Sequence, residues 1–269
     1  MQNVKRLNVV VPYRERQAHL KAFVPLLRAY FARDKIDHVI PYRVFIVEQE
    51  SDLPFNRGAI KNIGFVLGRE ESDYTCFHDI DYLPVWADYS WSDTPAAIVW
   101  HGAETRLWSL KHPGRRLGHK IEDFFGGVVL TPNALFERVN GYANTYWGWG
   151  WEDSDLRYRY QSAGITFTRR KGSFQGLDHD HDGYTLNDAM PWLTPTPKPT
   201  TLVNDRQFNE RWATDGTALK QVADGLTTLA FEILDRRPVP EGPVVERPAI
   251  WEIMKVRLKM KPPDSHPGT

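Results

Sequence analysis

The N-terminal part of the chain alternates between two hydrophobic patterns, and this alternation limits the fold more than any other feature. Short apolar runs at 7–11, 44–47 and 75–77 are typical of buried strands. Between them, apolar side chains recur at helical spacing over 17–31 and 56–67. Strands and helices in alternation, joined by short connections, predict an α/β fold with a Rossmann-like, mostly parallel central sheet flanked by helices. In such a sheet, ligands bind beyond the carboxyl ends of the strands.

The same alternation continues through most of the chain. Further strands and helices are predicted at 97–100, 127–130, 152–161, 165–168 and 203–234. Beyond them the chain is rich in proline and basic residues, a composition typical of a peripheral segment. We therefore expect one domain over 1–237 and a Pro-rich, basic C-terminal tail over 238–269.

Composition and charge exclude several classes of protein. The 34 Lys and Arg residues balance 34 Asp and Glu residues, which argues against a nucleic-acid partner bound by neutralising many phosphates. No apolar stretch approaches the roughly 20 residues of a membrane span, and the N-terminus has no signal-peptide pattern. The single cysteine, Cys76, excludes an intrachain disulfide and a Cys-rich zinc site. We expect a cytoplasmic protein; the sequence does not indicate its oligomeric state.

Two acidic segments are candidates for a metal site. Asp79 and Asp81 follow a predicted strand, and residues two apart in extended chain project to the same side, toward one divalent cation. His179 and His181 alternate with aspartates, which makes them either a ligand pair for a first-row metal or part of a solvated polar loop. One carboxylate with two imidazoles favours Mn²⁺, with Mg²⁺ as a substitute, and makes zinc less favoured.

A Trp-rich segment followed by acids, YWGWGWEDSD at 146–155, is the third candidate. Glycine contributes no side chain to a core, so tryptophans that alternate with glycines are better suited to swing over a ligand. The acids come at a predicted helix N-terminus, where the helix dipole stabilises an anion. A carboxylate beside aromatic rings provides what sugar transfer requires: a base for an acceptor hydroxyl and apolar faces for pyranose rings. The alternative interpretation is a capped helix behind a Trp-rich turn.

Three arginines lie near the ends of the first two strand–helix units: Arg14, Arg16 and Arg57. Arginine holds phosphate oxygens bidentately, so these side chains are candidates for binding a diphosphate. Each of them is also compatible with a solvated surface charge.

Taken in order, six segments resemble the β-1,4-galactosyltransferase family, glycosyltransferase family 7, over roughly residues 8–235. They are VPYRERQAHL (11–20), FNRGAIKNIGF (55–65), DYTCFHDIDYLP (73–84), FFGGVVL (124–130), NGYANTYWGWGWEDSD (140–155) and DGLTTLAFEIL (224–234). The HDHD and HDID segments look most like the xylose-accepting branch that builds the proteoglycan linker.

The resemblance implies a GT-A fold for 1–237, a UDP-sugar donor, Mn²⁺ and inversion at the anomeric carbon. Carried over by position, Asp81, His179 and His181 would ligate the metal. Asp153 would be the catalytic base, with Glu152 positioning the sugars. The donor side would be formed by Pro12, Tyr13, Arg14, Arg16, Phe55, Arg57, Asp79, Gly126, Gly127 and Trp149, the last as a mobile ring.

The implied activity is transfer of galactose from UDP-galactose to a sugar hydroxyl, with a β-1,4-type linkage, by single displacement. A transferase for UDP-N-acetylgalactosamine or another UDP-hexose, a non-catalytic carbohydrate-binding module and a metallohydrolase using the two histidines and Asp81 remain alternatives. Three departures from the family pattern bear on specificity: Phe124 where galactose-specific members carry tyrosine, Trp151 where they carry Gly or Arg, and Ser154 where they carry an acid. Because animal members have a membrane anchor and stem, whereas this chain begins at the first strand, we expect a soluble, bacterial-type enzyme.

Overall fold

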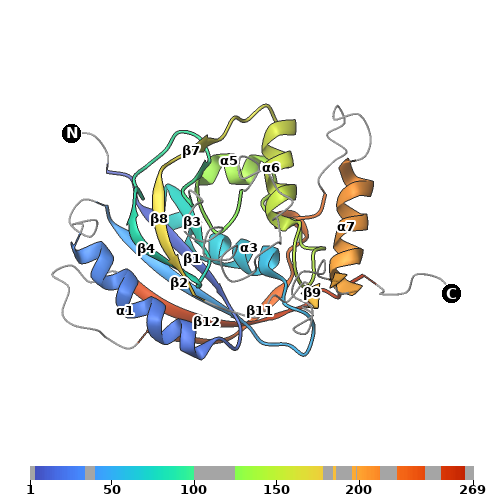
Figure 1. Ribbon diagram of the computed structural model, residues 1–269, viewed down its shortest axis with the longest axis horizontal. Coiled ribbons are helices and arrows are strands. Elements are labelled where there is room, and N and C mark those ends of the chain that lie inside the picture. The colour runs from blue at the N-terminus through green and yellow to red at the C-terminus, as the bar shows by residue number, and fades with distance from the viewer. Residues whose placement is uncertain are drawn as a thin grey trace.

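A computed structural model describes residues 4–33, 40–99, 125–177, 184–185, 196–197, 199–212, 223–239 and 250–263. In this part of the chain an eight-stranded sheet has the strand order β11-β12-β2-β1-β3-β6-β5-β7 (Figure 1). Its strands are β1 (Leu7–Tyr13), β2 (Tyr42–Gln49), β3 (Tyr74–His78), β5 (Ala96–Ala97), β6 (Val128–Pro132), β7 (Thr168–Arg169), β11 (Phe231–Pro238) and β12 (Ile250–Leu258). Two short ribbons add β4 (Tyr82–Ala87) with β8 (Gly172–Gly176), and β9 (Tyr184–Thr185) with β10 (Thr196–Pro197).

The centre of the sheet is parallel, as the alternating pattern predicts. β1 pairs in parallel with both β2 and β3, while β6 runs antiparallel to β3. All seven side chains of β1 are buried because helices cover both faces of the sheet. The predicted α/β fold with a mostly parallel central sheet is therefore confirmed.

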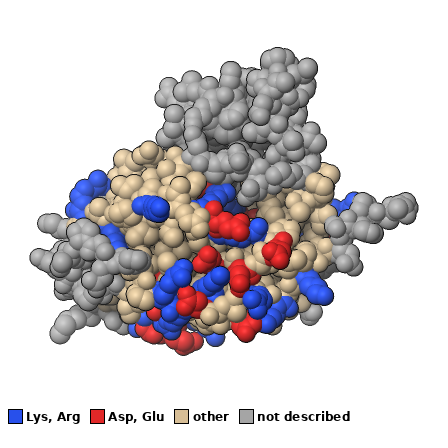
Figure 2. All heavy atoms as spheres, turned by 90° about the horizontal axis from the view of Figure 1, so that it is seen from below, with Lys and Arg blue, Asp and Glu red and all other residues tan. Residues whose placement is uncertain are grey.

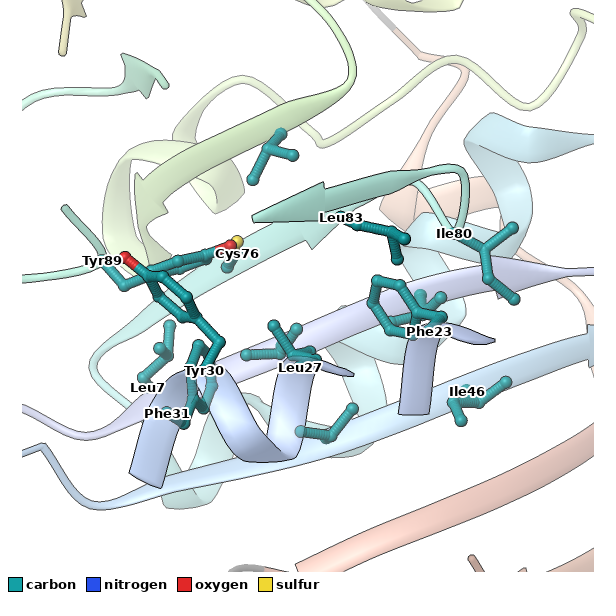
Figure 3. Close-up of a cluster of buried hydrophobic side chains, with 14 of the residues drawn as sticks. Leu7, Phe23, Leu27, Tyr30, Phe31, Ile46, Cys76, Ile80, Leu83 and Tyr89 are labelled. Carbon is teal, nitrogen blue, oxygen red and sulfur yellow. The ribbon is translucent and has the colours of Figure 1, made fainter. Parts of the chain in front are cut away.

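Two hydrophobic cores lie on opposite faces of the sheet. α1 (Gln17–Arg33) contributes Phe23, Leu27 and Phe31 to the first, which Figure 3 shows against the side chains of β1, β2 and β3. α3 (Arg57–Gly68), α5 (Asn133–Arg138) and α6 (Glu152–Ser162) close the second core on the other face. α7 (Pro199–Trp212) packs outside α6, with Phe208 in a small third cluster. Single 3₁₀ turns occur at η1 (Arg69–Glu71) and η3 (Leu226–Thr228).

The C-terminal part differs from the sequence expectation. β12 lies inside the sheet, parallel to β2 and antiparallel to β11, so the interpretation of 238–269 as a peripheral tail is wrong for this strand. Trp251, Ile253, Val256 and Leu258 are buried, and this near-alternating pattern outweighs the proline-rich composition around it. The predicted helix over 203–234 is also wrong in part, because α7 ends at Trp212 and β11 begins at Phe231.

The surface over the lower side of the molecule carries both signs of charge, as Figure 2 shows. Ion pairs link Arg236 of β11 to Glu252 of β12 at 2.7 Å, and Arg257 of β12 to Glu50, directly after β2, at 3.1 Å. Within the described ranges, every helix is too short or too polar to span a membrane.

Candidate active site

The candidate site lies beyond the carboxyl end of β3, beside the N-termini of α3 and α6. After His78 the chain turns through Asp79 and Asp81 into β4, and both residues are buried. The Asp79 N–H donates to the Gly127 carbonyl at 2.8 Å, which fixes the start of this turn against β6. Gly127 has a φ of +72°, and a Cβ there would lie about 3 Å from the Tyr82 ring and Val99. Gly127, which the resemblance places on the donor side with Gly126, therefore holds the acidic turn through its carbonyl group.

Arg57, the first residue of α3, joins three carboxylates. Its Nη1 donates to Asp79 Oδ2 at 2.7 Å and its Nη2 to Asp153 Oδ2 at 2.7 Å, while Nε donates to Glu152. Burial alone would lower the pKa of Arg57, but the three carboxylates raise it well above its ordinary value. The guanidinium is therefore a permanent cation that holds the acids of the β3–β4 turn and of α6 together.

Lys61 is a second cation in the same cluster, and no sequence motif singled it out. It lies one helical turn after Arg57 and its side chain is 1% exposed. Its Nζ lies 3.2 Å from Asp153 Oδ1 and 3.3 Å from Asp79 Oδ1, and 5.0 Å from the centre of the Tyr142 ring. The only sequence signal is its i, i+4 spacing from Arg57 on a predicted helix.

Close packing of α3 against the segment before α6 brings these charges together. The N-cap residue Asn56 accepts from the Ala59 N–H at 2.9 Å and donates to the Asn144 carbonyl at 2.7 Å. A Cβ on Gly58 would lie 2.6 Å from the Ala143 carbonyl oxygen, so only glycine permits this approach.

The two aspartates shared by Arg57 and Lys61 have opposite pKa shifts. Burial alone would raise the pKa of Asp79, but Arg57 and Lys61 outweigh burial and hold this pKa below its ordinary value. Burial raises the pKa of Asp153 to about 6, although Lys61 and Arg57 act in the opposite direction. A carboxylate with a pKa near 6 is mainly ionised at neutral pH and is a stronger base than an ordinary aspartate, as a general base requires.

The acids after the tryptophans divide between two environments. Glu152 and Asp153 face Arg57, whereas Asp155 is fully buried on another side of α6. Asp155 forms an ion pair with Arg159 and accepts from Tyr146 and Trp212, both at 3.1 Å. Asp155 therefore fastens α6 to its neighbours.

The Trp-Gly segment is held from outside by α7. The side-chain amide of Asn204 donates to the carbonyls of Trp147 at 3.0 Å and Trp149 at 3.1 Å. Trp147 is buried in the second core, so the expectation that these tryptophans avoid the core is wrong for this ring, while Trp149 is half-buried. Trp151 stacks on Phe208 with ring centres 4.3 Å apart. The segment is thus anchored at Trp147 and Trp151, and Asn204 also holds the backbone of Trp149 between them.

The expected donor-side residues line the end of β1 and the start of α3. Pro12 and Tyr13 are buried at the end of β1, and Phe55, which is half-buried, accepts a backbone hydrogen bond from Gly148 at 2.8 Å. Arg14 donates to the Leu53 carbonyl at 2.5 Å. Arg16 reaches Asp81, with 3.4 Å between Nη1 and Oδ2.

The remaining predicted site residues lie elsewhere. Gly126 accepts from the Val128 N–H at 2.9 Å and Ser154 is half-buried on α6, whereas Phe124, His179 and His181 lie outside the described residues.

The different surroundings of Asp79 and Asp81 fit the binding of a divalent cation by Asp81. Asp79 already faces two cations of α3, whereas the Asp81 carboxylate lies on the Arg16 side of the turn. The Asp81 carbonyl accepts from the Leu177 N–H at 2.8 Å, and His179 follows Leu177 by two residues in the sequence. Within the described residues themselves, three or more potential ligands do not come together.

Comparisons with known proteins identify the family. Residues 2–91 match the N-terminal region of glycosyl transferase group 7, and residues 109–181 match the N-terminal domain of galactosyltransferase. β-1,4-Galactosyltransferase 7 of Homo sapiens is 33% identical over 180 residues, which are 66% of this chain and 51% of that protein. The chain thus spans about half the length of the curated relatives it matches. It belongs to glycosyltransferase family 7, as the resemblance implied.

Solved structures establish the fold. The catalytic domain of Drosophila β-1,4-galactosyltransferase 7, in complex with xylobiose, superposes with a TM-score of 0.66 at 23% identity, over 96% of each chain. A mutant of that protein, solved with manganese, UDP-Gal and xylobiose, gives 0.65 at 22% identity, again over 96% of each chain. The described fold is therefore the GT-A fold that the resemblance implied.

Proposed function

We propose that this chain is an inverting, Mn²⁺-dependent glycosyltransferase that transfers galactose from UDP-galactose to a sugar hydroxyl, forming a β-1,4-type linkage. The observation that carries the proposal is Asp153, a carboxylate that is 14% exposed, has a pKa of about 6 and is held by Arg57 next to the acidic turn. Family membership and a relative solved with manganese, UDP-Gal and xylobiose support this choice of donor and metal.

In the proposed reaction Asp153 takes the proton of the acceptor hydroxyl. The acceptor oxygen forms a bond to the anomeric carbon while the bond from that carbon to the UDP oxygen breaks, so the configuration inverts in one step. Arg57 keeps Asp153 next to Glu152, which would position the sugars, and next to Asp79, which would contact the donor. The acceptor oxygen thus becomes a neutral glycosidic oxygen, while the negative charge passes to the departing UDP and the proton to Asp153.

The leaving diphosphate would meet the edge formed by Arg16 and Asp81. Asp81, with His179 and His181, would hold the metal, since carboxylate oxygen and imidazole nitrogen are donors that suit Mn²⁺. Bound there, the cation would supply charge neutralisation for the departing UDP. Arg16, 3.4 Å from Asp81, is suited to contact the same phosphates.

Specificity would come from the residues that depart from the family pattern. Trp151 packs its ring on Phe208, which gives the acceptor side a fixed aromatic surface rather than a free ring. Ser154 replaces an acid that would otherwise grip the acceptor, and Phe124 removes a tyrosine hydroxyl near the donor sugar. Because the relative was solved with xylobiose, a β-xyloside is the first acceptor to test.

The decisive experiment measures UDP release and product formation with UDP-galactose, Mn²⁺ and a panel of xylosides and N-acetylglucosaminides. We expect Asp153→Asn to bind donor normally but to lose turnover by at least about 10²-fold. The matched control, Asp235→Asn on the exposed part of β11, should keep wild-type turnover. Metal-independent turnover, or normal turnover in Asp153→Asn, would contradict the proposal. Free sugar as the product, with no acceptor consumed, would identify a hydrolase.

A further inference from the structure

Lys61 occupies a position where a lysine is difficult to explain by packing alone. Its side chain is 1% exposed on a helix whose nearby residues Ile60 and Ile63 belong to the second core. A buried ammonium group is costly unless it is paired. The described partners of Lys61 are Asp153, Asp79 and the face of the Tyr142 ring, and the first two are acids of the candidate active site.

We propose that Lys61 is a positioning residue that holds Asp153 in its ionised, proton-accepting form. This inference rests on the proposed function, because it gives a role to the base of that reaction. Lys61 lies deeper than Arg57, whose side chain is 28% exposed, so Lys61 acts through Asp153 rather than by touching a substrate.

The charges around Asp153 show why a single cation is not enough to keep this carboxylate ionised. Arg57 and Lys61 approach from α3, Glu152 from α6 and Asp79 from the β3–β4 turn. Three carboxylates therefore face two cations in this cluster. Removing the charge of Lys61 would leave Arg57 alone with three acids, and one of the acids would then take up a proton.

Asp153 is the acid that would take up this proton. Burial already raises its pKa to about 6. Arg57 binds Asp153 through Oδ2 and Lys61 through Oδ1, so each oxygen of the carboxylate has its own cation. With Lys61 present, both oxygens keep a fixed orientation and the base stays ionised.

The test is the pH dependence of kcat at saturating donor and metal. A general base is active only when ionised, so activity falls as the pH drops through the pKa of Asp153. In Lys61→Met, which removes the charge but keeps the length of the side chain, we expect this acidic limb to move up by about one pH unit. In Lys61→Arg, which keeps the charge, the limb should stay within about 0.3 unit of the wild type.

Ile60→Val is the matched control, because it alters a neighbouring buried side chain of α3 without altering charge. It should leave the acidic limb unchanged even if it lowers stability. An unmoved limb in a folded Lys61→Met variant would overturn the proposal. If that variant fails to fold, Lys61→Gln tests the same point, and a limb displaced by a full unit in Lys61→Arg contradicts the proposal independently.

The outcome for Lys61 is separable from the outcome for the proposed function. A wild-type protein without Mn²⁺-dependent UDP release would refute the proposed function itself. Active wild-type protein whose acidic limb is indifferent to the charge at position 61 would refute only the role of Lys61.

Discussion

Replacing Asp153 by asparagine is expected to stabilise the folded protein while it removes the base. In the native cluster, ionised Asp79, Glu152 and Asp153 face Arg57 and Lys61, so negative charge is in excess. Asparagine has nearly the shape of a protonated aspartate and restores the balance of charge. The side chain at this position is 14% exposed, so solvent screens the excess charge only weakly.

The magnitude follows from the pKa of Asp153, which burial raises from 3.8 to about 6. A raised carboxyl pKa means that the folded state binds more protons than the unfolded state, so stability falls as the pH rises from about 4 to about 6. Two pKa units correspond to about 3 kcal/mol. At pH 8 the ionised Asp153 therefore costs up to about 3 kcal/mol of folding free energy, and near pH 4.5 only about 1 kcal/mol.

The assay is urea unfolding of the wild type and of Asp153→Asn, followed by tryptophan fluorescence at both pH values. We expect the variant to be more stable by about 2–3 kcal/mol at pH 8, with a gain that shrinks as the pH falls. Asp79→Asn is the matched contrast, because the pKa of Asp79 is lowered and the loss of its charge should destabilise the fold at pH 8. If Asp153→Asn were destabilised at pH 8 as much as Asp79→Asn, the charge balance inferred here would be wrong.

Three further perturbations test the framework around the site. Asn204→Ala removes the donor that holds the carbonyls of Trp147 and Trp149, and should cost about 2–4 kcal/mol in urea unfolding and raise the KM for the donor. Gly58→Ala places a methyl group 2.6 Å from a backbone carbonyl, so we expect a loss of about 1–3 kcal/mol and lower kcat, measured on the same preparations. Trp251→Ala should cost about 3–5 kcal/mol if β12 is part of the sheet, whereas a peripheral tail would give almost no change in the urea midpoint.

The parallel centre of the fold and the acidic turn were predictable because their signals are local. Apolar runs mark β1, β2 and β3, and the acids of the turn follow the third run at once. The carboxyl ends of parallel strands meet at one edge of a sheet, so Asp79 had to lie near the end of β1. The acids at the start of α6 were predictable as a helix N-terminus, but their division into Asp153 at the site and Asp155 in a structural ion pair was not.

The C-terminal strand was not predictable in the same way because its partner is distant in sequence. Ile250 pairs with Arg43 and Val256 with Gln49, about two hundred residues away. The local sequence of β2 does not indicate that its outer edge pairs with a strand from the C-terminal part of the chain. The alternation of Trp251, Ile253 and Val256 indicates a strand, but proline-rich flanks favoured a tail.

Lys61 shows how a second layer of packing can bury a helix face that the sequence pattern predicts to be exposed. Helical periodicity assigns Ile60 and Ile63 to the core and leaves position 61 toward solvent, where a lysine is ordinary. Gly58 lets the segment before α6 cover that face, and α6, which follows this segment, supplies Asp153. A face that would be exposed in an isolated strand–helix unit thereby becomes a buried charged interface. An i, i+4 pair of cations on one helix and paired acids at the start of another are together a signal for such an interface, although neither is a signal alone.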